Sequence, residues 1–314
     1  MIKKAIIISI KGFKLTNKEK LLLSKERPWG LILFKRNIET LNQVKKLIKS
    51  IRQTTRDNKF PILIDEEGFS VSRLKKIINH DFSANFFGNL YREDTKISIQ
   101  IYKNYLTKLC NILKNIGINI NTIPVLDVLR THTSKVIRDR SFSNDQKIVQ
   151  KLGKITVEHC NTLKIATVAK HIPGHGFAIS DSHITTPRVN LDEGKLKKID
   201  FYPFKYNPAQ FAMTAHILYT KIDKKNVATL SKKIIYNIIR KKIGFKGILI
   251  SDDISMKALK YDLVTNAIKS LEAGCNLVLY CAGNIDDNFK LIKSIPFIDK
   301  FTLKKTSEFY NFLG

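Results

Sequence analysis

The sequence predicts an α/β protein, and more narrowly a single (β/α)8 barrel of the TIM type. Short β-branched runs alternate with longer amphipathic stretches along the 314 residues, which is typical of parallel strands joined by helices. The strand-like runs are continuously apolar, as expected of strands that are covered on both faces. About eight such runs can be recognised, and that number favours a closed barrel over an open sheet.

The expected strands are distributed over nearly the whole chain. They span residues 4–10, 29–34, 60–65, 120–127, 166–171, 210–216, 246–253 and 276–280. No GxGxxG motif follows the first strand, which argues against a dinucleotide-binding sheet. The apolar part of that first strand is too short for a signal peptide, and Lys11 follows it directly.

Helical patterns fill the intervals between the strands. The clearest span residues 41–55, 97–117, 145–165 and 230–244. In the second of these, Gly117 follows the last turn in a position typical of a helix C-terminus. The chain has no internal repeat or break in composition, so we expect one barrel domain over residues 1–314, with residues 296–314 as a C-terminal helical appendage.

The chain is strongly basic, with a formal net charge of +28. This charge suggests nucleic acid as a partner, but the basic residues are spread along the chain and no nucleic-acid-binding motif is found. We interpret them as a solvated lysine-rich surface and expect no specific nucleic-acid partner. The four cysteines form no CxxC pair, which favours a reducing, cytoplasmic location. No apolar run has the length needed to cross a membrane, so no membrane partner is expected.

Several expected strands end in charged or imidazole residues. These strand-end residues are Asp65, Lys170, His171, His216, Asp252 and Asp253. An unpaired charge at the edge of a core is costly, so such endings are rarely explained by stability alone. Because the carboxyl ends of the strands of a (β/α)8 barrel meet at one mouth, we expect these residues to share a polar pocket.

The segment KHIPGHGFAISDSH (170–183) is rich in histidine and glycine. His171 and His175 have the spacing of a helical zinc pair, but the proline and glycines around them argue against a helix and a metal site. Asp181 and His183 lie two residues apart, so the carboxylate can fix the tautomer of the imidazole and raise its basicity. This pairing predicts general acid–base chemistry, whereas a DSH triplet alone would indicate a solvated surface loop.

Asp252 and Asp253 are adjacent at a strand end, so their side chains are expected to point in opposite directions. One can face the pocket while the other fixes the following loop. A carboxylate at a barrel mouth can act as a base, a metal ligand or a nucleophile, and the spacing leaves these roles open.

Together these motifs resemble the family 3 glycoside hydrolases, and within them the compact bacterial β-N-acetylglucosaminidases of peptidoglycan recycling. The resemblance extends from residue 30 to residue 283 and is carried by KHIPGHG…DSH, SDDISM, MTAHI, PVLD and DRSF, each at its expected place. It implies a (β/α)8 barrel with the activity of a retaining β-N-acetylhexosaminidase, which works through a covalent glycosyl-aspartate intermediate.

The resemblance also implies roles for particular residues. Asp252 matches the nucleophile, His183 the acid/base and Asp181 its partner. The positions that match substrate-binding residues are Asp65, Arg73, Arg140, Lys170 and His171. His175 is expected to support the loop, and neither a metal nor an organic cofactor is implied. The expected partner is a small carbohydrate, a GlcNAc-containing muropeptide, and the expected oligomeric state is a monomer.

One loop departs from the family pattern. Family members read DQEGGRV where this chain has DEEGFSV, so Phe69 replaces a glycine and Ser70 replaces an arginine. In addition, Arg138 stands where a glycine usually precedes the DRS motif. A phenylalanine at a position that requires positive φ would be strained, so we expect this loop to be rebuilt.

Two alternative functions remain open at this point. A histidine acid/base leaves room for phosphate as the acceptor in place of water, which would make the protein a β-N-acetylglucosaminide phosphorylase. The altered loop and the +28 charge are compatible with a degenerate, non-catalytic protein that binds sugar or nucleic acid. The joint presence of Asp252, Asp181 and His183 argues against the second alternative, because a binding protein needs no nucleophile.

Overall fold

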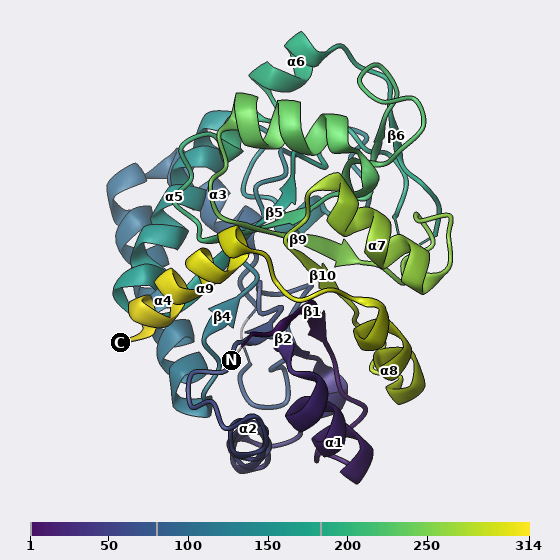
Figure 1. Cartoon of the computed structure of the whole chain (residues 1–314). Coiled ribbons are helices and arrows are strands. Elements are labelled where there is room, and N and C mark those ends of the chain that lie inside the picture. The colour runs from purple at the N-terminus through teal and green to yellow at the C-terminus, as the bar shows by residue number, and fades with distance from the viewer. Residues whose placement is uncertain (1, 80, 183) are drawn as a thin grey trace.

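The computed structural model describes residues 2–79, 81–182 and 184–314, in which parallel strands close into one barrel surrounded by helices (Figure 1). In order around the barrel, the strands are β1 (Lys4–Ile8), β2 (Pro28–Leu33), β3 (Ile62–Ile64), β4 (Ile120–Asn121), β5 (Ala166–Ile172), β7 (Phe211–Thr214), β9 (Ile248–Asp253) and β10 (Leu277–Leu279), which pairs with β1. Each strand coincides with an apolar run singled out in the sequence. The predicted fold class, a closed (β/α)8 barrel, is confirmed.

Helices connect successive strands on the outside of the barrel. They are α1 (Asn17–Glu26), α2 (Leu41–Thr55), α3 (Ala84–Glu93), α4 (Thr95–Ile116), α5 (Gln146–Thr162), α6 (Glu193–Lys198), η5 (Ile234–Ile243), α7 (Leu263–Ala273), α8 (Ile285–Ser294) and α9 (Lys300–Leu313). Short 3-10 turns occur at η1 (Lys35–Asn37), η2 (Arg138–Arg140), η3 (Tyr202–Phe204) and η4 (Ala228–Leu230).

The helical patterns in the sequence locate the helices closely. The structure differs in detail from the prediction at one helix and at one strand. Gly117 ends α4 with a φ of 96°, a conformation that glycine adopts without strain. The helix predicted over residues 230–244 is wound as a π-helix, η5, along most of its length. The strand predicted over residues 120–127 is regular only at its start, since Pro124 has no N–H to donate to the ladder.

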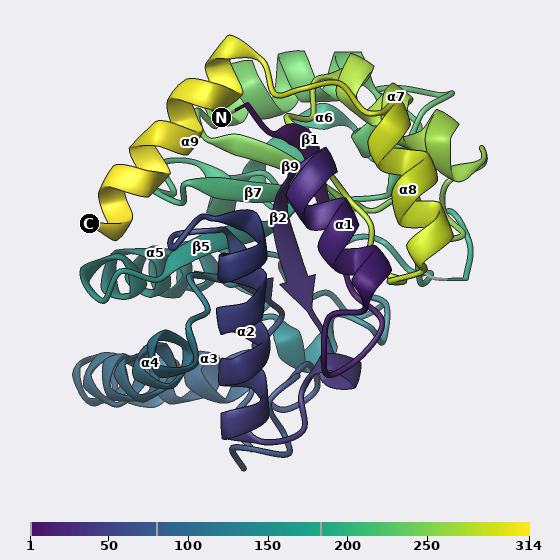
Figure 2. The same ribbon diagram turned by 60° about the horizontal axis from the view of Figure 1, so that its bottom comes forward.

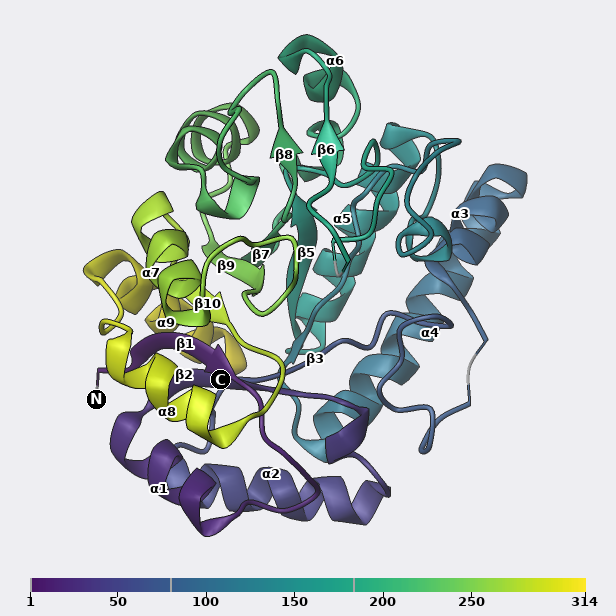
Figure 3. The same cartoon turned by 90° about the vertical axis from the view of Figure 1, so that its right-hand side faces the viewer.

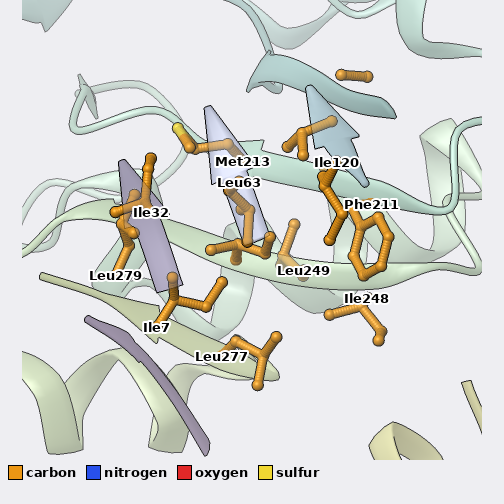
Figure 4. Close-up of a cluster of buried hydrophobic side chains, with 14 of the residues drawn as sticks. Ile7, Ile32, Leu63, Ile120, Phe211, Met213, Ile248, Leu249, Leu277 and Leu279 are labelled. Carbon is orange, nitrogen blue, oxygen red and sulfur yellow. The ribbon is translucent and has the colours of Figure 1, made fainter. Parts of the chain in front are cut away.

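The barrel is filled by branched side chains rather than by solvent. Figure 4 shows this cluster, to which β1, β2, β3, β4, β7, β9 and β10 all contribute. The labelled members are Ile7, Ile32, Leu63, Ile120, Phe211, Met213, Ile248, Leu249, Leu277 and Leu279, and all of them are buried. A solid core of this kind holds the strand ends in fixed relative positions, which a site built from several strands requires.

The C-terminal helix α9 packs near the N-terminal ends of the strands, close to the start of the chain (Figure 2). The ring of Phe309 on α9 lies 5.4 Å from the ring of Phe211 and 6.1 Å from that of Trp29, measured between centroids. The Trp29 indole donates a hydrogen bond of 2.9 Å to the hydroxyl of Thr306. This aromatic packing covers the end of the barrel that carries none of the strand-end polar residues.

At the other end, the connection from β5 to β7 is long and forms a small subdomain. Its strand β6 (Arg188–Val189) pairs with β8 (Leu218–Tyr219), and Figure 3 shows the two side by side beyond the barrel, next to α6. No helix of the described residues combines the length and apolar character needed to cross a membrane.

Candidate active site

A cavity of about 460 Å³ opens at the carboxyl ends of the barrel strands. Most of the site residues predicted from the sequence line it, namely Asp65, Arg73, Arg140, Lys170, His171 and Asp252. They come from positions nearly 190 residues apart in the chain and are brought together because parallel strands of a barrel end at the same mouth.

Asp65 follows β3 and is held by two cations and a hydroxyl group. Its carboxylate accepts hydrogen bonds from Arg73 at 2.8 Å, from Lys170 at 3.3 Å and from the hydroxyl of Thr122. Burial alone would raise the pKa of Asp65, but the positive charges of Lys170 and Arg73 outweigh it and hold the pKa below its usual range. Asp65 is therefore an ionised acceptor at the cavity wall.

Glu67 is a second ionised acceptor, and the sequence reasoning missed it. Arg140 donates to both of its carboxylate oxygens, at 2.6 and 2.9 Å, and Lys170 lies 2.6 Å away. Burial acts to raise the pKa of Glu67, while Arg140 and Lys170 lower it, and the net shift is downward. The available signal was its position two residues after Asp65, on the same side of an extended chain.

Lys170 thus bridges the two carboxylates, and this arrangement explains why a lysine can be buried at a strand end. Its side chain is only 3% exposed. The ammonium group also donates to Thr122 at 2.7 Å. The cluster of Asp65, Glu67, Lys170 and two arginines is a balanced ionic network whose geometry is fixed by several charge-assisted hydrogen bonds.

His171 is oriented by Asp127, the second residue that the sequence reasoning missed as a site residue. The His171 ring Nδ1 donates to a carboxylate oxygen of Asp127 at 2.7 Å. Asp127 also accepts from the backbone N–H groups of His171 at 3.2 Å and His175 at 2.7 Å. Its carboxyl group is fully buried. Burial acts to raise the pKa of Asp127, but its interactions with His171 and His175 together hold the pKa below its usual range, so the carboxylate stays ionised and Nε2 of His171 is left to face the cavity.

The adjacent aspartates at the end of β9 have different environments, as their alternation in an extended strand predicts. Asp253 accepts hydrogen bonds from Ser255 at 2.7 and 3.1 Å and from the backbone of Cys281 at 3.3 Å, which fixes the following loop. Burial raises its pKa. For Asp252, burial also acts to raise the pKa. Its interactions with His216, His171 and the other nearby donors together outweigh burial, so the pKa of Asp252 is below its usual range. The surroundings therefore favour the ionised form of Asp252 more than that of Asp253.

His216 lies near Asp252 and contributes to the lowering of its pKa, but its hydrogen bonds go to other groups. Its Nε2 donates to the backbone carbonyl of Asp253 at 3.0 Å, and its Nδ1 interacts with the hydroxyl of Thr229 at 2.7 Å. Both ring nitrogens are therefore occupied by protein atoms. We assign His216 a structural role beside the carboxylates and not a direct role toward a ligand.

The segment after β5 falls into two parts, which we call the loop base (residues 173–178) and the loop tip (residues 179–185). Most of the loop base is buried, including His175, whereas the tip contains exposed side chains. Ser182 lines the cavity, and its carbonyl accepts from the backbone N–H of Ala258 at 3.1 Å. Asp181 precedes it and accepts, through its carbonyl, from Ile184 and Thr185. His183, the predicted acid/base, lies outside the described residues.

The strain that a positive φ would impose on Phe69 does not arise. Positive φ falls on the preceding Gly68, at 139°, whereas Phe69 is not among the described residues with positive φ. The Phe69 ring is about half exposed, with the Lys75 ammonium 5.1 Å from its centroid. Ser70 donates to Asp139 at 2.5 Å. The loop therefore accommodates its unusual residues by pointing one outward and pairing the other.

The donor set does not form a metal centre within residues 2–79, 81–182 and 184–314, where no group of three or more His, Cys, Asp or Glu side chains could hold an ion. Two of its carboxylates, Asp65 and Glu67, are instead paired with arginine and lysine. Such a cavity offers ionised acceptors and cationic donors in alternation, which suits a ligand with many hydroxyl groups.

Comparison with known proteins identifies the family. Residues 3–300 match the glycosyl hydrolase family 3 N terminal domain. The chain belongs to glycosyl hydrolase family 3. The resemblance found in the sequence is thereby confirmed, as is the enzyme class, a glycoside hydrolase.

Similar proteins cover almost the same length. The beta-hexosaminidase of Actinobacillus succinogenes is 34% identical in an alignment 304 positions long, which covers 93% of this chain and 86% of that protein. The beta-hexosaminidase of Haemophilus influenzae strain Rd is 33% identical, with 93% and 85% covered. The crystal structure of NagZ from Neisseria gonorrhoeae in complex with N-trifluoroacetyl-D-glucosamine superposes with a TM-score of 0.88 at 28% identity, over 98% of this chain and 90% of NagZ.

Proposed function

We propose that this family 3 glycoside hydrolase is a retaining β-N-acetylhexosaminidase that removes terminal non-reducing β-N-acetylglucosamine. The observation that carries the proposal is Asp252, a carboxylate kept ionised at the end of β9. The cavity around it is lined by hydrogen-bond donors and acceptors of the kind that bind sugar hydroxyl groups. An ionised carboxylate is the form needed for attack on an anomeric carbon. The names of the related beta-hexosaminidases support the choice of sugar.

The ionic network would bind the terminal sugar. Asp65 accepts hydrogen bonds from sugar hydroxyl groups, while Arg73 and Lys170 hold that carboxylate in place and donate to the ring substituents. His171, oriented by Asp127, donates or accepts through Nε2. Arg140 acts mainly through Glu67, because its guanidinium group is engaged by that carboxylate on two nitrogens. NagZ from Neisseria gonorrhoeae, which binds an N-acylated glucosamine, supports a pocket for an acetamido group.

The proposed reaction has two steps. A carboxylate oxygen of Asp252 forms a bond to the anomeric carbon as the bond to the leaving oxygen breaks, and His183 gives that oxygen its proton. In the second step, water attacks the glycosyl-aspartate, His183 takes the proton from the water, and the bond to Asp252 breaks. Asp181 would hold the His183 ring in the tautomer that both proton transfers require.

We propose GlcNAc-containing muropeptides of cell-wall recycling, in the cytoplasm, as the natural setting. This part rests on the resemblance of the KHIPGHG…DSH and SDDISM motifs to the compact bacterial enzymes. A GlcNAc-anhydro-muropeptide should therefore be cleaved with a higher kcat/KM than a simple chitobiose, because contacts to the leaving group lower the transition-state energy further. Equal kcat/KM values for the two substrates would indicate an enzyme that hydrolyses β-N-acetylhexosaminides in general.

The deciding experiment measures release of a chromogenic phenol from its β-N-acetylglucosaminide. Asp252→Asn is expected to lower kcat by about 10⁴-fold, since it removes the nucleophile but keeps the shape. Asp253→Asn is the matched control, because it makes the same chemical change one residue along, and it should lose far less. Wild type that is folded but inactive, or an Asp252→Asn variant that keeps its rate, would refute the proposal. Products that form only when phosphate is present would identify a phosphorylase.

The role of His183 is tested by the leaving group. His183→Ala should slow hydrolysis of a substrate with a poor leaving group by about 10³-fold, and that of a dinitrophenyl glycoside much less, because a good leaving group needs little protonation. Comparable losses on both substrates would contradict the acid/base role.

A further inference from the structure

Asp200 is a buried carboxyl group that the proposed reaction does not use. It follows α6 in the long connection from β5 to β7, and its exposed fraction is 0%. Figure 3 shows α6 next to β6 and β8. A fully buried aspartate normally has an ion-pair partner. Within the described residues no ion pair involves Asp200, and its Oδ1 has no hydrogen-bond partner. Its position therefore calls for an explanation.

The loop base lies directly against Asp200. A Cβ atom added to Gly174 would stand 2.6 Å from Cβ of Asp200, and one added to Gly176 would stand 2.9 Å from its Oδ1. The backbone N–H of Phe177 points at Oδ2 from 3.5 Å. The two glycines of the PGHG motif are thus needed for the close approach of this backbone to a carboxyl group, and not only for the turn.

The groups around Asp200 act on its ionisation in both directions: burial and the Asp127 carboxylate oppose it, whereas the Phe177 N–H and the Arg130 guanidinium favour it less strongly. The charged and titratable side chains that face it are Asp127 and Arg130 from the segment after β4 and Tyr219 from β8. Asp127 is already ionised by its contacts with His171, so a second carboxylate nearby is unfavourable. The Tyr219 hydroxyl donates its hydrogen bond to the carbonyl of Gly174 and not to Asp200. Burial, followed by the Asp127 charge, raises the pKa of Asp200 to about 8.

Building on the proposed function, we propose that Asp200 is a positioning residue for the acid/base loop: its un-ionised carboxyl group supports the loop base, and its ionisation loosens this support. The uncharged group packs against Gly174 and Gly176 without a counter-ion. A charged group there would draw in water or a cation and displace the glycine backbone. The loop tip, which carries Asp181 and His183, continues directly from this support, so enzyme turnover depends on it.

Hydrogen exchange tests the positioning role without reference to activity. Asp200→Asn keeps the shape of the un-ionised acid but cannot ionise. Between pH 7 and pH 9 the exchange rates of the Phe177 and Ala178 amides in wild type, divided by those in Asp200→Asn at the same pH, should rise about tenfold. Dividing by the variant removes the intrinsic pH dependence of exchange. Amides of α4 serve as controls and should keep a ratio near one. A ratio for Phe177 and Ala178 that stays constant to pH 9 would overturn the proposal.

Turnover provides the second test, at pH 6.5 on the chromogenic glycoside. Asp200→Asn should keep kcat within about threefold of wild type, and Asp200→Ala should lose about 30-fold in kcat with little change in KM, because the loop delivers the acid/base and not the sugar-binding groups. Equal losses in the two variants, or a loss confined to KM, would contradict the positioning role. Wild type without glycosidase activity would refute the proposed function alone, since the exchange experiment would still decide the role of Asp200.

Discussion

The loop base and the loop tip are neighbours in the chain but are held by different forces. The base is fixed from several sides: Gly176 accepts from the Thr133 hydroxyl at 2.6 Å, Ala178 accepts from the Ser134 backbone at 3.0 Å, and His175 donates to Asp127 at 2.7 Å. The tip carries side chains such as Ile179, which is 70% exposed. The Ser182 carbonyl of the tip accepts a hydrogen bond of 3.1 Å from the backbone N–H of Ala258 in the loop after β9.

This difference fits the role proposed for the loop in catalysis. A base that is buried and hydrogen-bonded at several points keeps the end of β5 in register with the cavity, whereas the described residues of the tip bury few side chains. The segment of residues 173–185 therefore combines a buried base with a tip whose described side chains are more exposed. The following experiments probe the base first, where the largest effects are expected, and the tip last.

Gly176→Ala should give the largest effect. The new Cβ would lie 2.1 Å from the backbone oxygen of Val128, a contact that requires the loop base to move. We expect a loss of about 5 kcal/mol in the free energy of unfolding, measured by urea denaturation. Gly194→Ala is the matched control, because no atom lies within 4 Å of its added Cβ, and it should change stability by less than about 1 kcal/mol. Similar stability of the two variants would mean that the base is not tightly packed.

Asp200→Asn should change the pH dependence of stability. Because the pKa of Asp200 is about 8 in the folded chain and lower in the unfolded chain, the unfolded chain loses this proton first as the pH rises, so wild-type stability falls between pH 4 and pH 8. The variant lacks this contribution. Its free energy of unfolding relative to wild type should rise by about 4 kcal/mol from pH 4 to pH 7, as followed by thermal and urea unfolding. Parallel pH profiles would show that Asp200 is ionised in the folded protein.

His175 should show the opposite pH dependence. Burial lowers its pKa to about 4 in the folded chain, so on acidification the unfolded chain takes up the proton first and stability falls between pH 6.5 and pH 4. Over this pH range the free energy of unfolding of wild type should fall by about 3 kcal/mol more than that of His175→Gln. The exposed His132, replaced in the same way, is the control and should leave the profile unchanged. An unchanged profile in His175→Gln would place a charged imidazole in the loop base.

The smallest effects are expected in the loop tip. Ile179→Ala and Ile184→Ala remove side chains that are 70% and 66% exposed, so each should change the free energy of unfolding by less than about 0.5 kcal/mol. Urea denaturation of the two variants beside Gly176→Ala gives the comparison directly. A loss above about 1 kcal/mol in either would show that the tip is packed against the protein, and the contrast between base and tip would fail.

Much of the site could be read from strand ends. Asp65, Lys170, His171 and Asp252 were found because each follows an apolar run, and the ends of parallel strands must meet in a barrel. Glu67 and Asp127 were missed as site residues because their importance lies in their partners. Glu67 pairs with the cations Arg140 and Lys170, and Asp127 orients the ring of His171. Partners distant in sequence leave no signal in a single chain.

The sequence by itself determined the barrel, the order of its strands and the set of polar groups at its mouth, because apolar periodicity and strand-end chemistry are local properties. The tertiary structure decided which of two adjacent aspartates has its pKa lowered, that Gly68 and not Phe69 takes the positive φ, and that Asp200 lies buried against the loop base. These outcomes depend on burial and on charges contributed by other strands, and both exist only once the chain has folded.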